Sequence, residues 1–175
     1  MKMVLGIFNS VSDINSLIIE LYEMGCSRED ISIITRKDVV EGNIKIENDA
    51  SKGISKGAKV GGVIGGLAGL LAGIGFLTLP GIGALFIAGP LAAALGITGI
   101  AGATASGAIT GALAGGFISA LKELGLDELK AKKYEDAVKE GKILIGVNES
   151  GDNSKEIEGL MKDCGAEDTT TLEVK

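Results

Sequence analysis

A long uncharged stretch constrains this sequence more than any other feature. Between Val60 and Leu121 the chain contains no Asp, Glu, Lys or Arg. On a helix, small residues at every fourth position form a smooth stripe along which two backbones approach closely, as in pairs of membrane helices. The stretch therefore predicts a glycine zipper, folded into a hydrophobic helical hairpin over residues 60–122. The predicted helix-packing residues are Gly61, Gly65, Gly69, Gly73, Ala103, Gly107, Gly111 and Gly115.

The middle of the stretch contains both prolines of the chain and predicts the turn of this hairpin. The predicted turn residues are Pro80, Gly81, Gly83 and Pro90. A transmembrane helix needs about 20 apolar residues, and the arms 60–79 and 96–121 are just long enough. Lysines stand outside both arms, so two spans would leave both termini in the cytoplasm. We therefore expect a place in the cell membrane, with membrane lipid as a partner.

Two other interpretations fit the same stretch. Gly and Ala contribute little hydrophobic driving force for insertion into lipid. The hairpin would then pack against copies of itself in a lipid-free structural homopolymer or shell, with the protein in the cytoplasm as a large assembly. A flexible glycine-rich region is the third interpretation. A phosphate-binding loop is excluded by spacing, because Phe86 stands where the dinucleotide fingerprint requires glycine.

The segments outside the stretch show the periodicities of an α+β domain. Short apolar runs predict four strands: Met3–Phe8, Ile31–Thr35, Lys142–Val147 and, as an edge strand, Thr169–Val174. Apolar residues at helical spacing predict three helices, with the stripes Ile14, Leu17, Ile18, Leu21 and Tyr22; Leu126, Leu129, Ala137 and Val138; and Ile157, Leu160, Met161 and Cys164. Without the middle helix, the order strand, helix, strand occurs twice, which predicts a ferredoxin-like split βαβ plan.

The predicted organisation is one interrupted domain. Residues 1–36 plus 123–175 form the ferredoxin-like α+β domain, residues 37–59 a polar linker, and residues 60–122 the Gly/Ala-rich hydrophobic helical hairpin. The insertion falls between the second and third strands, where a chain that returns to its starting point disturbs the sheet little. The short apolar run near the N-terminus shows no signal-peptide pattern, which also favours cytoplasmic termini.

The composition argues against most catalytic and nucleic-acid-binding classes. The net charge is -6 and Arg28 and Arg36 are the only arginines, so a phosphate-binding surface is not expected. The chain has no His, which removes His-dependent catalysis and most zinc sites. Cys26 and Cys164 lack metal-ligand spacing. They are expected as half-buried free thiols, or as a disulfide if their helix ends adjoin.

The adjacent carboxylates Asp127/Glu128 and Glu167/Asp168 are the acid pairs that a small-ligand sensor or an enzyme would use. Exposed carboxylates on a helix and in a loop are their ordinary interpretation. We therefore expect no catalytic, cofactor-binding or metal-binding residue, no cofactor and no nucleic-acid partner. A small-ligand sensor that uses the sheet domain stays open as an alternative.

Several short motifs are spread over nearly the whole chain. They are Gly6-Ile7-Phe8 at the end of the first strand, Leu79 to Gly83 and Ala88-Gly89 in the Gly/Ala-rich block, and Tyr134 and Gly141 in the charged helix after it. With these motifs the chain resembles a bacterial family of general stress proteins, or low-temperature-induced proteins. It departs from the family at Gly125-Leu126-Asp127, where members often have Gly-Ile-Pro. The resemblance implies stress-linked expression and proximity to a membrane, and it implies no catalytic residue.

Together these features predict a non-enzymatic, membrane-associated, self-assembling protein of the stress type. The glycine-striped hairpin would lie in or on the membrane, with the α+β domain on the cytoplasmic side. The main partner would be the protein itself, as a homo-oligomer held by the stripes.

Overall fold

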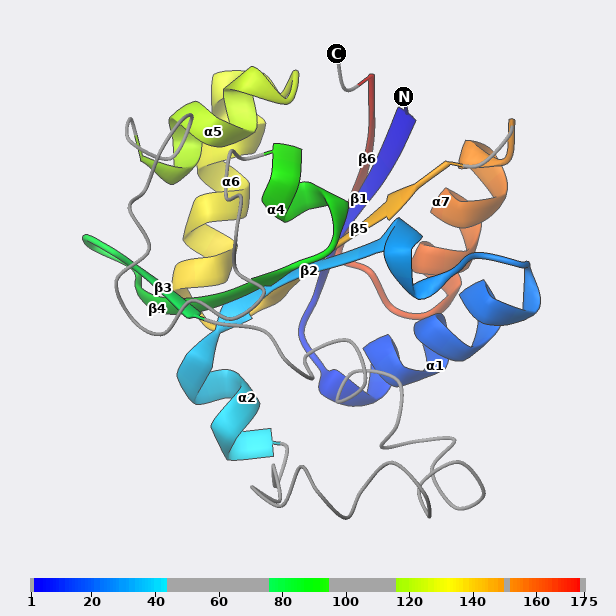
Figure 1. The fold of residues 1–175 in the computed structure, drawn as a ribbon, viewed down its shortest axis with the longest axis horizontal. Coiled ribbons are helices and arrows are strands. Elements are labelled where there is room, and N and C mark those ends of the chain that lie inside the picture. Colours follow the sequence, from blue (N-terminus) through cyan, green and yellow to red (C-terminus); the bar gives the residue numbers. More distant parts are fainter. Residues whose placement is uncertain (1, 44–75, 95–115, 150–151, 174–175) are drawn as a thin grey trace.

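The computed structural model describes residues 2–43, 76–94, 116–149 and 152–173. In these ranges, six strands form one antiparallel sheet in the order β3-β4-β2-β5-β1-β6 (Figure 1). The strands are β1 (Lys2–Phe8), β2 (Ile31–Arg36), β3 (Phe76–Leu79), β4 (Gly83–Ala88), β5 (Ile143–Asn148) and β6 (Asp168–Glu173). The helices are α1 (Val11–Glu23), α2 (Lys37–Asn43), α4 (Pro90–Ala94), α5 (Phe117–Glu123), α6 (Glu128–Lys139) and α7 (Ser154–Asp163). The predicted α+β class is confirmed.

The central strands are buried on both faces, which explains their nearly continuous apolar sequences. In β1, Met3 and Leu5 enter one hydrophobic cluster, whereas Val4 and Phe8 enter the other. Alternate side chains of a strand point to opposite faces. A strand covered on both sides therefore needs apolar residues at nearly every position. Strand β5 follows the same rule, because all its residues are buried.

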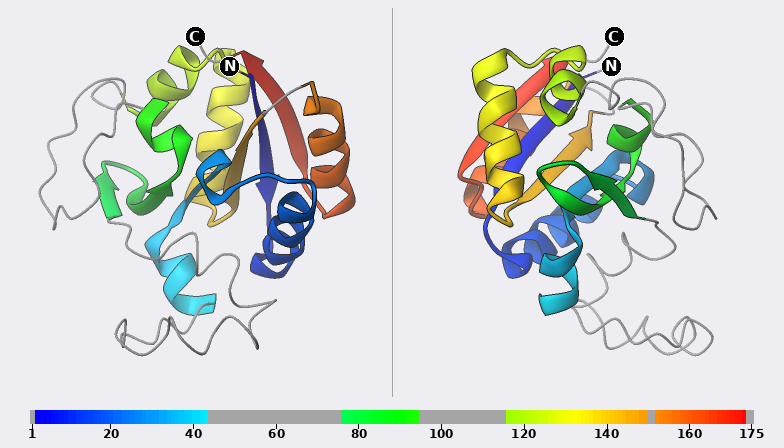
Figure 2. Two further views of the ribbon diagram at one scale, coloured as in Figure 1. Left: turned by 45° about the vertical axis from the view of Figure 1, so that its right-hand side comes forward. Right: turned by 90° about the vertical axis from the view of Figure 1, so that its left-hand side faces the viewer.

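Helices α1 and α7 cover one face of the sheet (Figure 2). From the predicted stripes, the fully buried residues are Ile14, Leu17, Ile18, Leu21, Ile157 and Met161. Tyr22, in the last turn of α1, is 42% exposed. Gly6 in β1 lets α7 come close, because a Cβ atom at this position would lie 2.9 Å from Met161 Sδ. The predicted stripes thus correspond to the core on this face, apart from Tyr22 and from Leu160 and Cys164, which are half-buried and pack against the cluster.

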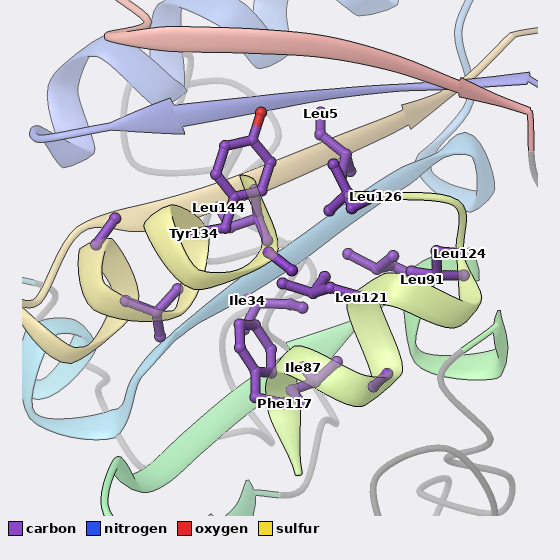
Figure 3. Packing of buried hydrophobic residues seen from close by; sticks show 14 of the residues in the cluster. Leu5, Ile34, Ile87, Leu91, Phe117, Leu121, Leu124, Leu126, Tyr134 and Leu144 are labelled. Atoms are coloured by element: carbon purple, nitrogen blue, oxygen red, sulfur yellow. The ribbon is translucent and has the colours of Figure 1, made fainter. Parts of the chain in front are cut away.

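Helices α4, α5 and α6 cover the opposite face of the sheet (Figure 3). Tyr134 of α6, Phe117 and Leu121 of α5, and Leu91 of α4 pack in one cluster with Ile34 of β2. All three helices come from the chain between β2 and β5. The long connection therefore covers the second face, and the sheet is a middle layer between two helical layers.

Leu129 is a correction to the predicted core. The sequence pattern places it on the buried stripe of the charged helix, but in the structure it is 83% exposed. Helix α6 begins at Glu128, after the N-cap Asp127. An α-helix turns by about 100° per residue, so Leu129 lies about 140° around the helix from the buried Tyr134. That position faces solvent.

The first predicted helical arm is wrong at its inner end, where residues 76–79 form strand β3 rather than the end of a helix. Residues 83–88, in the predicted turn region between the arms, form strand β4. A β-turn joins them, in which Ile82 N donates a hydrogen bond to Leu79 O over 3.2 Å. Its centre is Pro80-Gly81, and Gly81 has a φ of +82°. Pro followed by Gly with positive φ is the sequence of a type II turn.

The outer parts of the predicted insertion also differ from expectation. The polar linker predicted at 37–59 begins with helix α2, in which Val40 is buried. The end of the predicted second arm is helix α5, whose buried residues pack in the hydrophobic core of the α+β domain. Residues 44–75 and 95–115, with all the predicted stripe residues, lie outside the described residues. Within the described ranges, no helix is both long enough and apolar enough to pass through a membrane.

Candidate functional site

The predicted turn residues lie at two separate places. Pro80 and Gly81 are exposed in the turn between β3 and β4, and Gly83, with a φ of +97°, begins β4. Pro90 instead begins helix α4. These residues therefore do not form one connection between two helices. The eight predicted stripe residues lie outside the described residues, so the structure does not place them.

Helix α4 is held against β2 by a close backbone approach at Gly89. Gly89 has a φ of +77°, and a Cβ atom at this position would lie 2.3 Å from the carbonyl oxygen of Ile31. The buried Ser32 holds the start of α4, because its Oγ accepts a hydrogen bond from Leu91 N over 2.9 Å. Strand β4 pairs with β2 along residues 33–36. The middle of the uncharged stretch is therefore an integral part of the sheet.

Strand β3 forms one edge of that sheet (Figure 1). It pairs with β4 on one side, and no strand in the described part of the chain pairs on its other side. None of its four residues is charged. Thr78 is exposed, Leu77 is half-buried and Leu79 is buried. Because the backbone groups of an open edge tend to pair with another strand, this edge is a candidate interaction surface.

Strand β6 forms the opposite edge and is flanked by charged side chains. Lys130 Nζ of α6 donates a hydrogen bond to Thr170 Oγ1 over 2.7 Å. On the other side, Thr169 Oγ1 donates to Glu158 Oε1 of α7 over 3.0 Å. Helices on both faces of the sheet thus present charge to this strand. Charges of this kind oppose the addition of a further strand.

A cleft of about 370 Å³ lies beside this edge, between α6 and the starts of β5 and β6. Each of its lysines has a carboxylate partner: Lys132 with Asp136 at 3.3 Å, Lys133 with Asp168 at 3.2 Å and Lys142 with Glu167 at 2.7 Å. The hydrogen bond from Lys142 lowers the pKa of Glu167, and the same bond raises the pKa of Lys142. Both groups therefore stay charged around neutral pH. The cleft offers balanced ion pairs rather than a surface of one sign.

The adjacent carboxylates considered as acid pairs have structural partners. Asp127 caps α6 by accepting a hydrogen bond from Lys130 N over 2.9 Å. Lys122 donates to Glu128 over 2.9 Å, which lowers the pKa of Glu128. Burial raises the pKa of Tyr134 to about 12. A general acid or base works with a pKa near the operating pH, and these pKa shifts point away from neutral pH.

The two cysteines are free and half-buried, as expected. Cys26 follows the C-terminal end of α1. Gly165, next to Cys164, lies against the opposite end of the same helix, because a Cβ atom on it would lie 3.3 Å from Asp13 Oδ2. The structure has no disulfide between the two cysteines. Burial raises the pKa of both thiols, which disfavours the reactive thiolate.

The described side chains contain no arrangement that would hold a metal ion, because His, Cys, Asp and Glu do not gather there in groups of three or more. Carboxylates beside the cleft are held instead by lysines. The chain was also compared with models of protein families, with characterised proteins and with solved structures. None of these comparisons finds a match.

Proposed function

We propose that this chain is a non-enzymatic, membrane-associated, self-assembling protein of the stress type. The proposal rests on one observation. A domain with a charged surface carries two uncharged, Gly- and Ala-rich segments, 60–75 and 95–115, and β3, β4 and α4 between them belong to the same domain. Uncharged segments of this length favour an apolar partner over water. Lipid and copies of the same segments are the two partners that fit.

We also propose that β1, β2, β5 and β6 follow the ferredoxin-like plan, with the remaining elements as an insertion. Two observations support this. The four strands are adjacent in the order β2-β5-β1-β6, with antiparallel neighbours. Helices α1 and α7, which follow β1 and β5 in the chain, share one face. A pair of split βαβ units has this arrangement.

The anchored middle of the stretch changes how the segments would meet a membrane. Two successive spans would carry residues 80–95 to the far side of the bilayer, but β4 pairs with β2 of the domain. Each segment must then enter and leave the lipid on the side of the domain. Two crossings need about 40 residues, more than 44–75 or 95–115 contains. The proposal therefore puts the segments at the membrane surface, with the domain and both termini on the cytoplasmic side.

A lipid-free homopolymer or shell is the second candidate, and the same anchoring favours it. Segments too short to cross a bilayer twice can still pack against segments of other copies, because stripes of small residues let backbones approach closely. A small-ligand sensor on the sheet surface loses support. Both faces of the described sheet are covered, one by the cluster around Leu17 and the other by the cluster around Leu121.

Flotation of the purified full chain with phosphatidylcholine vesicles tests the proposal. The double variant Gly107→Asp/Gly111→Asp puts two charges into the second segment. Placing a charge in an apolar medium costs several kcal/mol, so we expect the vesicle-bound fraction to fall about tenfold or more. The control is Gly159→Asp in α7, at a glycine where an added Cβ atom would have no neighbour within 4 Å. This variant should float like the unmodified chain.

Two results would contradict the proposal. Flotation that survives both added charges would show that the second segment is not what contacts the lipid. A chain that stays out of the vesicles and sediments as a large particle would contradict membrane association itself. If that particle dissociates in the variant Gly65→Leu/Gly69→Leu/Gly107→Leu/Gly111→Leu, the lipid-free assembly replaces the membrane proposal.

A further inference from the structure

We propose that the outer edge of β3 is where a second copy of this chain adds to the sheet, with β3 against β3 in antiparallel. This inference rests on the proposed self-assembly and names the surface that sets its register. Pairing about a two-fold axis puts the same edge of each copy against the other, as in most homodimers. The two sheets then become one continuous sheet.

The backbone of β3 specifies another strand as the partner. The strand is in regular register with β4, from Phe76 opposite Phe86 to Leu79 opposite Gly83. Its outward N–H and C=O groups are therefore already spaced for a neighbouring strand. The described ranges contain no strand on that side. Natural sheets commonly protect an open edge with charge or with proline in the strand, and β3 has neither.

An identical strand suits this edge because self-pairing brings no like charges together. The four residues of β3 are Phe-Leu-Thr-Leu. Cross-strand pairs of apolar and β-branched residues each contribute about 0.2–1 kcal/mol. At the other edge, an antiparallel pair of β6 strands would bring the acidic residue at the start of one strand, Asp168, near the acidic residue at the end of the other, Glu173, which is unfavourable. Pairing with the same strand of a second copy is therefore favourable at the β3 edge and unfavourable at the β6 edge.

The edge is short, so it sets register rather than affinity. Four residues span about 13 Å and make only a few hydrogen bonds, whereas a stable interface buries about 1,200 Å² or more. Strand β3 follows the uncharged segment 60–75 directly in the sequence. Copies held together by these segments would bring their β3 edges close. Segment packing then supplies the contact area, and strand pairing supplies the alignment.

Thr78 and Thr171 offer a matched variant and control. Both are exposed threonines on edge strands, at opposite edges of the sheet. Both also point to the same face. Thr171 pairs with Val4 of the α1 and α7 cluster, and Thr78 lies between Leu77 and Leu79, which pack on the other cluster. Replacing either residue by Lys adds one charge beside an edge.

Sedimentation velocity of the full chain measures the association of each variant. In the two-fold register that places Thr78 opposite Thr78 of the second copy, the two lysines face each other, so we expect Thr78→Lys to weaken self-association at least tenfold. Thr171→Lys should leave it unchanged. Amide hydrogen exchange at residues 77–79 should slow as protein concentration rises in the unmodified chain and in Thr171→Lys, but not in Thr78→Lys.

Equal association of the two variants, or protection of residues 77–79 that does not depend on concentration, would overturn the inference. Vesicle flotation of the same samples separates it from the proposed function. If Thr78→Lys floats normally and associates normally, strand pairing fails while membrane association stands. If Thr78→Lys dissociates the oligomer while the unmodified chain does not float with the vesicles, strand pairing stands and membrane association fails.

Discussion

The two edges of the sheet differ in chemistry although they close the same sheet. Strand β6 has acidic residues at both ends and hydrogen bonds to charged side chains of α6 and α7. Strand β3 has no charge, and in the described residues it pairs with the sheet through β4. Open edges promote association unless charge, proline or short length protects them. Among the described residues, charge protects one edge, and short length is the protection of the other.

The two edges also depend on different anchors. Strand β6 pairs directly with the central strand β1 along six residue pairs. The β3 edge depends instead on β4, on the approach of Gly89 to β2 and on the hydrogen bond from Leu91 N to Ser32. Variants of these anchors should therefore affect the β3 edge, and variants of charged side chains the β6 edge.

The largest expected effect is at Gly89. Its positive φ disfavours any residue with a side chain, and an added Cβ atom would clash with the backbone of β2. Gly89→Ala should lower the free energy of unfolding by about 3 kcal/mol or more, because positive φ and a backbone clash add together. Gly81→Ala is the matched control, since its φ is also positive but an added Cβ atom would have no neighbour within 4 Å. That control should cost about 1–2 kcal/mol. Urea unfolding of both variants checks this, and equal losses would show that Gly89 is not an anchor.

The hydroxyl of Ser32 is the next test of the comparison. Ser32→Ala leaves the buried Leu91 N–H without its acceptor, which should cost about 1–3 kcal/mol. Thr169→Val removes a hydroxyl at the β6 edge, whose hydrogen bond to Glu158 is only part-buried, and should cost less than about 1 kcal/mol. Urea unfolding measures both losses, and hydrogen exchange should show faster exchange in α4 for Ser32→Ala alone. A larger loss for Thr169→Val would reverse the comparison.

Acid should weaken the β6 edge before the β3 edge. Hydrogen bonds from Lys162 and from Lys142 lower the pKa of Glu158 and of Glu167, respectively. A lowered folded-state pKa contributes stability above the unfolded pKa, about 4.3 for Glu, and this stability is lost as pH falls through the folded value. Protection factors of residues 168–173 should therefore fall between pH 5 and pH 3 more than those of β3, which has no titratable side chain. A parallel fall at both edges would contradict this, and Lys142→Met should reduce the difference.

The smallest expected effect belongs to the ion pair between Lys133 and Asp168. The Lys133 side chain is 60% exposed, and exposed pairs contribute about 0.2–1 kcal/mol. Lys133→Ala should therefore destabilise the protein only slightly, and the loss should vanish in about 1 M salt, where screening acts within about 3 Å. Unfolding at low and high salt measures this. A large loss that is independent of salt would mean that the side chain acts through packing.

Local patterns predicted most of the elements outside the uncharged stretch. The strand at Met3–Phe8 and the stripe around Leu17 correspond to β1 and α1, and the Thr-rich run near the C-terminus is the edge strand β6. Leu129 was assigned to the core wrongly, because one apolar residue near the start of a helix does not show which side of the helix faces the sheet. The β3 edge was missed because a four-residue strand within a Gly- and Ala-rich stretch is too short to show a period of two.

The sequence by itself determined which segments bury apolar side chains, where the chain turns at Pro80-Gly81, and that no charge occurs from Val60 to Leu121. These are local properties, because periodicity and turn chemistry act over a few residues. Only the tertiary structure decided that residues 76–94 join the sheet and that α4, α5 and α6 cover its second face. The physical reason is that pairing of β4 with β2, and the fit of Gly89 against Ile31, join residues far apart in the chain. No short window of sequence contains both partners.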